Sequence, residues 1–406
     1  MPILKKQTVD QDVLTLALDR IRHIYDLFDH VAVSFSGGKD STVVFNLALQ
    51  VARERGRTPL RVLHFDEEAI PADVEDYLRR MAQIPDVKIE WYCVPIKHRN
   101  ACDPKHPYWY TWAEESRDLW CRPMPPEAIT QIPGYDATNP KNRRTIPEIS
   151  SLLFPPELGR CCMLLGIRAD ESITRYMAVA RRGDENYLIQ HGSGFGGTDV
   201  INYKHVYKAY PIYDWSTADV WTAPALMGWD YCSYYDLCEM CGISHSQQRL
   251  APPFGEEPFQ SLWKFSKTYP ELWQRMVNRV PGANTAALYS RTALYGFGDV
   301  PEKPADISWP DFLAQQLRKH DTKTQKLTAA RISEEIKRHY KKTDEPILDK
   351  VGHYITGLSW EFLLMLAIRS DTKERKRAGT MKKSREQYEA ARAAAEAGLS
   401  EDGTRY

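Results

Sequence analysis

The spacing of apolar residues along the first hundred positions alternates between helical and strand-like periods. Runs in which apolar residues recur every three or four positions predict amphipathic helices, and short β-branched or aromatic runs predict buried strands. The predicted helices cover residues 11–28, 41–53 and 71–82, and the predicted strands cover residues 31–36, 60–66 and 87–94. Helices that alternate with strands in this way are typical of a parallel sheet in an α/β layer fold.

The rest of the chain predicts one long insertion and a helical C-terminal part. Residues 97–158 are rich in Pro, Trp and charged side chains and have weak periodicity, which is typical of a lid or binding segment over the sheet. The strand pattern resumes at residues 162–168 and again at 205–213, and a helical pattern follows each run. Because a Pro-rich run then precedes mostly helical sequence, we expect an α/β domain over residues 1–250 and a helical region over residues 251–406.

The composition is that of a globular protein. Of the 406 residues, 43% are hydrophobic and 11 are Trp, which is too apolar and aromatic for a disordered chain. No stretch reaches the roughly 18 uncharged apolar residues that a membrane helix needs. The first residues lack the apolar core of a signal peptide. We therefore expect a cytoplasmic protein without a membrane partner.

The charge is balanced over the whole chain but not along it. With 54 Lys plus Arg and 54 Asp plus Glu, the formal net charge is zero. This balance excludes a protein whose whole surface is basic and binds nucleic acid. Residues 301–406 nevertheless carry 21 basic and 17 acidic residues, and windows 318–342 and 373–392 concentrate the excess. Two interpretations stay open for these predicted basic helices: solvated faces, or a surface that contacts the phosphates of a nucleic acid.

The strongest chemical signal is the run SFSGGKDST at residues 34–42, between a predicted strand and a predicted helix. Two consecutive glycines let the backbone take positive φ and approach a ligand closely, and the amides around them form an anion-binding nest. Lys39 adds a positive charge, while Asp40 either caps the helix or holds Mg²⁺. The residues predicted to contact the ligand are Ser34, Ser36, Gly37, Gly38, Lys39, Asp40 and Ser41. Ligands of open parallel sheets bind at such strand ends.

The loop differs from the usual nucleotide loop GxxxxGK(S/T), which this sequence lacks. Residues 36–41, SGGKDS, resemble instead the SGGxDS hallmark of the pyrophosphatase-loop (PP-loop) superfamily, also called adenine nucleotide α-hydrolase-like. This resemblance implies an enzyme that cleaves ATP between its α and β phosphates or binds an adenylated sulfate. It also implies that Lys39 and the loop amides neutralise charge on the leaving pyrophosphate, an electrostatic role.

Two further motifs narrow the resemblance. In LLGIRADESITR, residues 164–175, a strand ends at Gly166 and is followed by Arg168 and Glu171, although an ordinary strand before a capped helix has the same pattern. An arginine at a strand end beside a phosphate loop suits bidentate contact with phosphate or sulfate. In YPIYDWSTADVW, residues 210–221, a serine or threonine is placed to cap the helix that follows.

Together the three motifs resemble the phosphoadenosine phosphosulfate (PAPS) reductase family over roughly residues 25–245. The resemblance implies a Rossmann-like, HUP-type parallel sheet with helices on both faces. It implies that Arg168 clamps a phosphate or sulfate, that Glu171 positions Arg168, and that Gly166 lies against the nucleotide. It further implies that the run HFDEE, 64–68, lies beside the adenine or ribose, so Phe65 and Asp66 become candidate nucleotide-binding residues.

Several other segments resemble a subgroup of this family, the immunoglobulin-binding-regulator A type. These segments are LWCRPMP at 119–125, SQQRLAPPFGEE at 246–257, VPGANTAALY at 280–289 and LSWEFLLMLAIRSD at 358–371. Such proteins often occur beside a ParB-like partner, so the resemblance implies a ParB-like protein partner and, through the basic helices, a nucleic acid.

The cysteines add a candidate metal centre. Cys161 and Cys162 are adjacent, and Cys238 and Cys241 form a CxxC pair. Four thiolates suit a [4Fe-4S] cluster or zinc, and related enzymes of the superfamily carry clusters on comparable cysteines. The alternative interpretation is that these cysteines pack as small core residues.

The substrate and the reaction stay open between two readings of the resemblance. Reductases of the family use a Glu-Cys-Gly-Leu-His motif, and the nearest match here, residues 239–245, has a different spacing. ATP therefore has at least the same weight as PAPS. We expect an enzyme of sulfur metabolism that acts on the α-phosphate or transfers a sulfur group. The alternative is a nucleotide-binding regulator, or a component that incorporates sulfur into nucleic acid, acting with a ParB-like partner.

Overall fold

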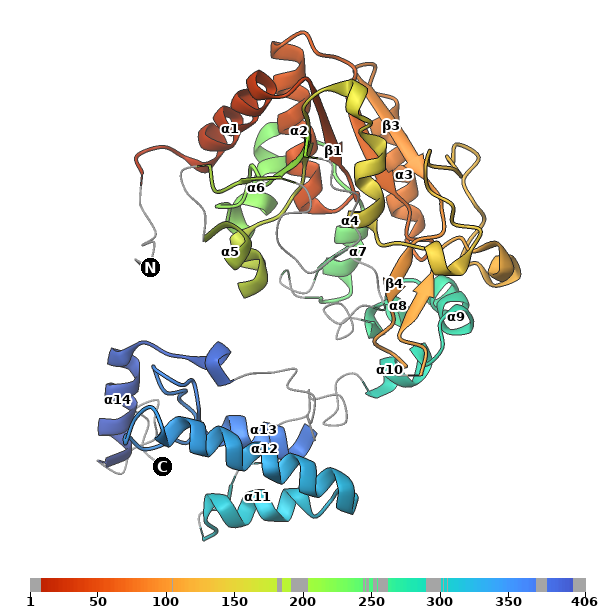
Figure 1. The fold of residues 1–406 in the computed structure, drawn as a ribbon. Coiled ribbons are helices and arrows are strands. Elements are labelled where there is room, and N and C mark those ends of the chain that lie inside the picture. The colour runs from red at the N-terminus through yellow and green to blue at the C-terminus, as the bar shows by residue number, and fades with distance from the viewer. Residues whose placement is uncertain are drawn as a thin grey trace. The chain divides into compact units, whose positions relative to one another are not determined.

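The structure, a computed structural model, contains two compact units. It describes residues 9–103, 105–180, 185–190, 204–243, 245, 248–250, 254, 262–289, 301, 303–304, 306–369 and 378–396. The first unit spans residues 1–286 and the second spans residues 287–406. Each unit is described by itself below (Figure 1).

The first unit is built on a six-stranded sheet with the strand order β3-β2-β1-β6-β8-β7. The strands are β1 (His30–Ser34), β2 (Leu60–Phe65), β3 (Val87–Tyr92), β6 (Cys161–Leu164), β7 (Leu188–Gln190) and β8 (Val206–Ala209). All neighbours pair in parallel except β7 with β8. The expected parallel α/β sheet is confirmed. Because β1 lies between β2 and β6, three strands end close together at the carboxyl edge where β1 leads into the predicted loop.

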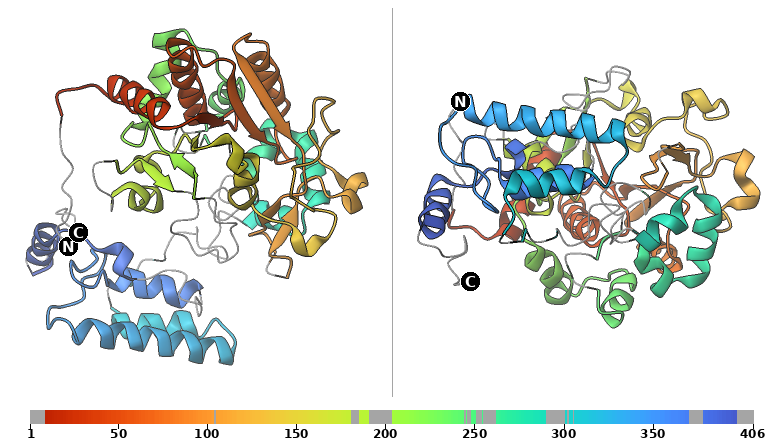
Figure 2. Two further views of the ribbon diagram at one scale, coloured as in Figure 1. Left: turned by 45° about the horizontal axis from the view of Figure 1, so that its top comes forward. Right: turned by 90° about the horizontal axis from the view of Figure 1, so that it is seen from below.

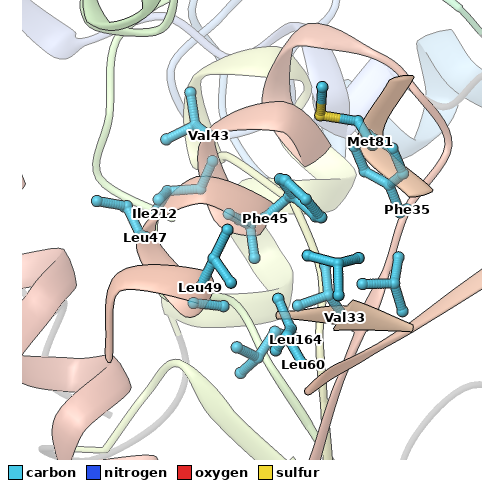
Figure 3. Packing of buried hydrophobic residues seen from close by; sticks show 14 of the residues in the cluster. Val33, Phe35, Val43, Phe45, Leu47, Leu49, Leu60, Met81, Leu164 and Ile212 are labelled. Carbon is cyan, nitrogen blue, oxygen red and sulfur yellow. The ribbon is translucent and has the colours of Figure 1, made fainter. Parts of the chain in front are cut away.

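One face of this sheet is covered by helices that follow the alternating pattern. They are α1 (Val13–Leu27), α2 (Lys39–Glu54), α3 (Ala72–Ala82), α6 (Thr217–Met227) and α7 (Tyr234–Met240). Their apolar residues share one core cluster with inward-facing strand residues such as Val33, Leu60 and Leu164. Figure 3 shows residues of α2, including Val43 and Phe45, against these strands. Burying one whole side of α2 fixes the position of the loop that precedes it.

The other face of the sheet is covered by the insertion at 97–158. Its elements are β4 (Lys97–Arg99), β5 (Tyr108–Tyr110), η1 (Glu114–Leu119), η2 (Pro140–Asn142), α4 (Ile146–Ile149), η3 (Ser150–Leu153) and η4 (Pro156–Leu158). Ile149 and Phe154 pack with Leu63 and Met163 in a second core cluster. Much of the insertion is therefore part of the core, since the strand residues that point away from α2 need an apolar cover.

The remaining helices fall into both units. The first unit also contains η5 (Ala169–Glu171), α5 (Ile173–Ala180), α8 (Trp263–Thr268) and α9 (Pro270–Arg279), and the boundary between the units falls within α10 (Ala283–Tyr289). The division at residue 286 lies beyond the expected boundary at 250. The reason is that α9 and its C-terminal end bind the insertion: Asn100 Nδ2 donates to the carbonyl of Pro281 at 3.2 Å, and Arg279 pairs with Glu68.

The second unit is helical, as the periodicity predicted. Its elements are α11 (Trp309–Leu317), α12 (Thr322–Tyr340), α13 (Trp360–Arg369), η9 (Ala378–Met381) and α14 (Arg385–Glu396), drawn in cyan to blue in Figures 1 and 2. Phe312, Ile332 and Leu363 belong to its own apolar core. No helix in the described ranges is both long enough and apolar enough to cross a membrane.

Candidate functional site

The loop between β1 and α2 is held in a tight turn by hydrogen bonds of its own serine hydroxyls. Gly37 has φ of +77°, a backbone conformation that residues with a side chain rarely adopt. The amide of Gly38 donates to Ser36 Oγ at 3.3 Å, and the hydroxyl of Ser41 donates to the carbonyl of Gly38 at 2.8 Å. Ser36 Oγ and Ser41 Oγ lie 3.1 Å apart. The predicted turn is therefore present, with Gly38 directly before the first residue of α2.

Gly166 brings the end of β6 against the first turn of α2. A Cβ atom at this position would lie 2.6 Å from the carbonyl carbon of Asp40 and 2.7 Å from the amide nitrogen of Ser41. Backbone atoms cannot move aside as the end of a flexible side chain can, so only glycine fits. This close approach places Arg168, two residues later, beside the loop.

Arg168 and Lys39 share one carboxylate. Arg168, only 2% exposed, donates from Nε to Asp40 Oδ1, and from Nη1 to the carbonyl of Trp215 at 3.3 Å and to Thr217 Oγ1 at 3.4 Å. Lys39 Nζ lies 3.3 Å from Asp40 Oδ2. Asp40 thus bridges the two cations that the sequence predicted for the site.

The neighbourhood of the loop carries more positive than negative charge. Lys39 Nζ also donates to the carbonyl of Gln248 at 3.3 Å, which places Arg249 close by. Burial lowers the pKa of Lys39, the nearby Asp40 raises it, and the charges of Arg168 and Arg249 lower it further. We call Lys39, Asp40, Arg168 and Arg249 the cationic cluster. It has three positive groups and one carboxylate, so it favours an anionic ligand.

Glu171 does not position Arg168, which corrects the expectation from the sequence. Its carboxylate pairs with Arg175 one helical turn later, while the carbonyl of Glu171 accepts from Arg249 Nη2 at 3.3 Å. The carboxylate that orients Arg168 is Asp40, because the close approach at Gly166 aligns the two strand ends. Asp170 Oδ2 lies 3.9 Å from Arg168 but its side chain is exposed.

The third sequence motif caps a helix and also supports the site. The hydroxyl of Ser216 accepts the amide of Asp219 at 3.2 Å, and Asp219 Oδ2 accepts the amide of Ser216 at 2.7 Å, a reciprocal cap that confirms the expected helix start. The neighbouring Trp215 carbonyl and Thr217 hydroxyl are the two acceptors that hold Arg168. The motif therefore fixes the orientation of the arginine.

Sequence reasoning missed two aromatic residues at the loop. The hydroxyl of Tyr235 on α7 accepts the amide of Lys39 at 2.8 Å. Lys39 Nζ lies 6.0 Å from the ring centroids of both Tyr235 and Trp221. Neither contact has a local sequence signal, because both residues are more than 180 positions from the loop.

The carboxylate of Asp66, a candidate nucleotide-binding residue, accepts hydrogen bonds from the protein itself, and its contact with a nucleotide stays a prediction. It is fully buried, and its Oδ2 accepts from Trp91 Nε1 at 2.7 Å and from Arg122. Its Oδ1 accepts the amide of Glu68 at 2.8 Å and Trp112 Nε1 at 3.2 Å. Two donors occupy each oxygen, which leaves little capacity for a ligand.

Phe65 and Glu68, the neighbours of Asp66, are also held by contacts within the protein. The ring of Phe65 stacks on Tyr92 at 5.6 Å within the second core cluster. Glu68 is fully buried with φ of +61°, and it accepts the amide of Trp112 at 2.7 Å and Arg279 Nε at 2.7 Å. We call Asp66, Glu68, Arg122 and Arg279 the paired cluster, since two carboxylates face two guanidinium groups. It ties the insertion and α9 to the end of β2.

The candidate cysteine centre is also corrected. Cys161 and Cys162 are successive residues of β6, so their side chains point to opposite faces and belong to different core clusters. Burial raises the pKa of Cys161 to about 11. Cys238 is buried in the first cluster and Cys241 is half-buried. The part of the chain that the structure describes contains no group of three His, Cys, Asp or Glu residues arranged to hold a metal ion.

The Asp40 carboxylate is shared by two side-chain cations, and the expectation that it holds Mg²⁺ stays a prediction. One of its oxygens faces Arg168 and the other faces Lys39. We therefore assign the Asp40 carboxylate to these two residues, and no step below depends on a metal.

Comparisons with known proteins find a relative and two family models. The protein YbdN of Escherichia coli strain K12, described as uncharacterized, is 28% identical over 330 residues, which cover 77% of this chain and 76% of that protein. Residues 242–355 match a domain of unknown function, DUF3440.

Solved structures show a more distant likeness. A Candida auris PAPS reductase in complex with phosphate has 13% identity over 57% of this chain and 94% of that chain, with a TM-score of 0.31. A Candida glabrata FMN adenylyltransferase has 13% identity and a TM-score of 0.30, and the match spans only 63% of that chain.

A second family model matches more than half of the chain. It covers residues 30–248, from the start of β1 to the residue whose carbonyl accepts from Lys39, and so includes every element of the cationic cluster but Arg249. The chain belongs to the phosphoadenosine phosphosulfate reductase domain family.

Proposed function

We propose that the chain is an enzyme that binds an adenine nucleotide, ATP or PAPS, at the loop of residues 34–42. The observation that carries the proposal is the excess of positive charge in the cationic cluster: Lys39 and Arg168 share one carboxylate, Asp40, and the charge of Arg249 acts on Lys39 as well. Buried or half-buried positive charge without a matching carboxylate is unfavourable by itself. A bound polyanion would balance it.

The arrangement suits electrostatic catalysis at an α-phosphate. When an acceptor oxygen attacks the α-phosphorus, the bond to the β-phosphate oxygen breaks and negative charge grows on the leaving pyrophosphate. Lys39 is placed to neutralise that charge, and Arg168, held by Asp40 and the Trp215 carbonyl, to orient the transferred group. With PAPS, the same cations would hold the sulfate during transfer of the sulfur group.

A second candidate function rests on the helical unit. The C-terminal end of α12 and the residues after it expose Lys337, Arg338, Lys341 and Lys342. We propose as the alternative that the chain is a nucleotide-binding regulator, or a component that incorporates sulfur into nucleic acid. It would act with a ParB-like partner and contact nucleic-acid phosphates through these side chains.

One assay tests both candidates. We expect the full chain to release pyrophosphate from ATP, or adenosine bisphosphate from PAPS, and we expect Lys39→Ala to lower the rate about 100-fold or more, as removal of one transition-state contact does. The regulator would be favoured if the chain alone binds the nucleotide tightly but does not turn it over, and if turnover appears only when DNA is added. Full activity of Lys39→Ala, or no binding of either nucleotide, would contradict the proposal.

A further inference from the structure

The hydroxyl of Tyr235 lies directly over the backbone of the phosphate loop. It accepts the Lys39 amide at 2.8 Å, and a Cβ atom built on Gly38 would lie 3.4 Å from it. The side chain is held in place, since it is only 3% exposed and packs edge to face with Trp221 at 5.0 Å and with Tyr234 at 5.4 Å. The phenol therefore occupies a fixed position beside the anion-binding amides.

This hydroxyl has a hydrogen left to donate. A phenol carries one O–H donor and also accepts hydrogen bonds, and here the oxygen already accepts from Lys39. Burial raises the pKa of Tyr235 well above its usual value, so the group keeps its proton at any physiological pH. Among the described residues, no acceptor is recorded for that hydrogen. An unused buried donor beside the amides of the loop is suited to an anionic oxygen.

We propose that Tyr235 is a ligand-binding residue of this site, whose hydroxyl takes the Lys39 amide hydrogen and donates its own hydrogen to a phosphate or sulfate oxygen. The inference rests on the proposed function and adds a donor that the loop motif does not contain. It gives the loop a contact from α7, a helix far away in the sequence. If the hydroxyl only blocked the Lys39 amide instead, it would compete with the ligand, and its removal would tighten binding.

The opposite signs of these two effects allow a direct test. Calorimetric titration would compare wild type with Tyr235→Phe, using ATP, inorganic pyrophosphate and adenosine as probes. We expect about tenfold weaker binding of ATP and pyrophosphate, the effect of losing one hydrogen bond to a charged group, and unchanged binding of adenosine. Tyr77→Phe is the matched control: it removes a buried hydroxyl that bonds Thr42 of the same helix α2 at 3.1 Å. We expect it to leave all three affinities unchanged.

The result also separates this inference from the proposed function. If wild type binds ATP and Tyr235→Phe binds it equally or more tightly, the inference is overturned and the nucleotide site stands. If wild type binds neither ATP nor PAPS, the proposed function itself fails. Should Tyr235→Phe fold poorly, 3-fluorotyrosine at position 235 keeps the shape and makes the phenol a better donor. We expect tighter pyrophosphate binding with it, and weaker or unchanged binding would overturn the inference.

Discussion

Two groups of buried charges follow neighbouring strands at the same edge of the sheet, yet they have different charge balances. In the paired cluster, after β2, Asp66 pairs with Arg122 and Glu68 pairs with Arg279, and Arg122 also pairs with Glu75 of α3 at 2.8 Å. The cationic cluster, after β1 and β6, has three positive groups and one carboxylate, Asp40, while the exposed Asp170 lies 3.9 Å from Arg168. Asp66 directly follows β2, whereas Asp40 lies in the first turn of α2. The partners of each acidic residue determine how far the protein balances the charge of its cluster.

The largest loss of stability is expected for a substitution in the paired cluster. Glu68→Gln would leave Arg279 buried without its carboxylate, and removal of one partner of a buried pair typically costs about 3–5 kcal/mol. Urea unfolding followed by tryptophan fluorescence would measure the loss. The variant should still bind ATP where it is folded, because no residue of the cationic cluster contacts Glu68 in the described part of the chain.

A surface pair gives the control for this prediction. Asp86 lies 2.8 Å from Arg53, and both side chains are exposed. Asp86→Asn should therefore change the free energy of unfolding by less than about 1 kcal/mol. A similarly small loss for Glu68→Gln would show that the paired cluster does not hold the insertion and α9 in place.

A pH effect of intermediate size is expected at Glu67, between the two carboxylates of the paired cluster. Burial, and then the charge of Asp66, raise the pKa of Glu67 to about 8. A carboxyl whose pKa is raised by folding stabilises the fold fully below its unfolded value near 4.5, and this contribution is lost as the pH rises through about 8.

The matched variant isolates this titration. Glu67→Gln cannot ionise, so its free energy of unfolding should fall less than that of wild type between pH 5 and pH 8.5. Because the side chain keeps some exposure to solvent, we expect a difference of only about 1–2 kcal/mol. Urea unfolding of both proteins across this range would measure it. Parallel pH profiles would place Glu67 in water as an ordinary surface carboxylate.

The sequence predicted the local parts of both regions and not their pairings. The strand, loop and helix around Gly37 follow from hydrophobic period and glycine chemistry, which act over a few residues. Asp66 and Asp40 looked alike as acids after strands, because the donors that distinguish them, Trp91 and Arg168, come from elsewhere in the chain. The CC and CxxC spacing predicted a metal centre for the same reason: spacing does not show that successive strand residues face opposite ways.

No local sequence pattern could predict the contact between Tyr235 and Lys39. It depends on α7 packing beside α2, which is set by apolar contacts of the whole first core cluster. The sequence could not show which arginine pairs with Glu171, because Arg168 and Arg175 are both close to it along the chain. The conformation of the backbone decides the pair, and it brings Arg175 to Glu171.

The smallest change in the free energy of unfolding is expected for a substitution in the cationic cluster. Unlike Glu68→Gln in the paired cluster, this substitution should not destabilise the fold. Lys39→Met keeps the length of the side chain and removes a buried charge whose pKa burial has lowered. Asp40 still has Arg168 as a partner, so no carboxylate is left alone. Replacement of a buried ion by an apolar side chain is often neutral or stabilising. We therefore expect the free energy of unfolding to stay unchanged or to rise by about 1 kcal/mol, while nucleotide turnover is lost.

The gain in the free energy of unfolding should shrink as the pH rises through the lowered pKa of Lys39, since the wild-type amine then loses the charge that burial disfavours. Urea unfolding without ligand at several pH values would measure it, and a loss above about 2 kcal/mol would mean that Lys39 is a structural partner of Asp40 like the arginines of the paired cluster.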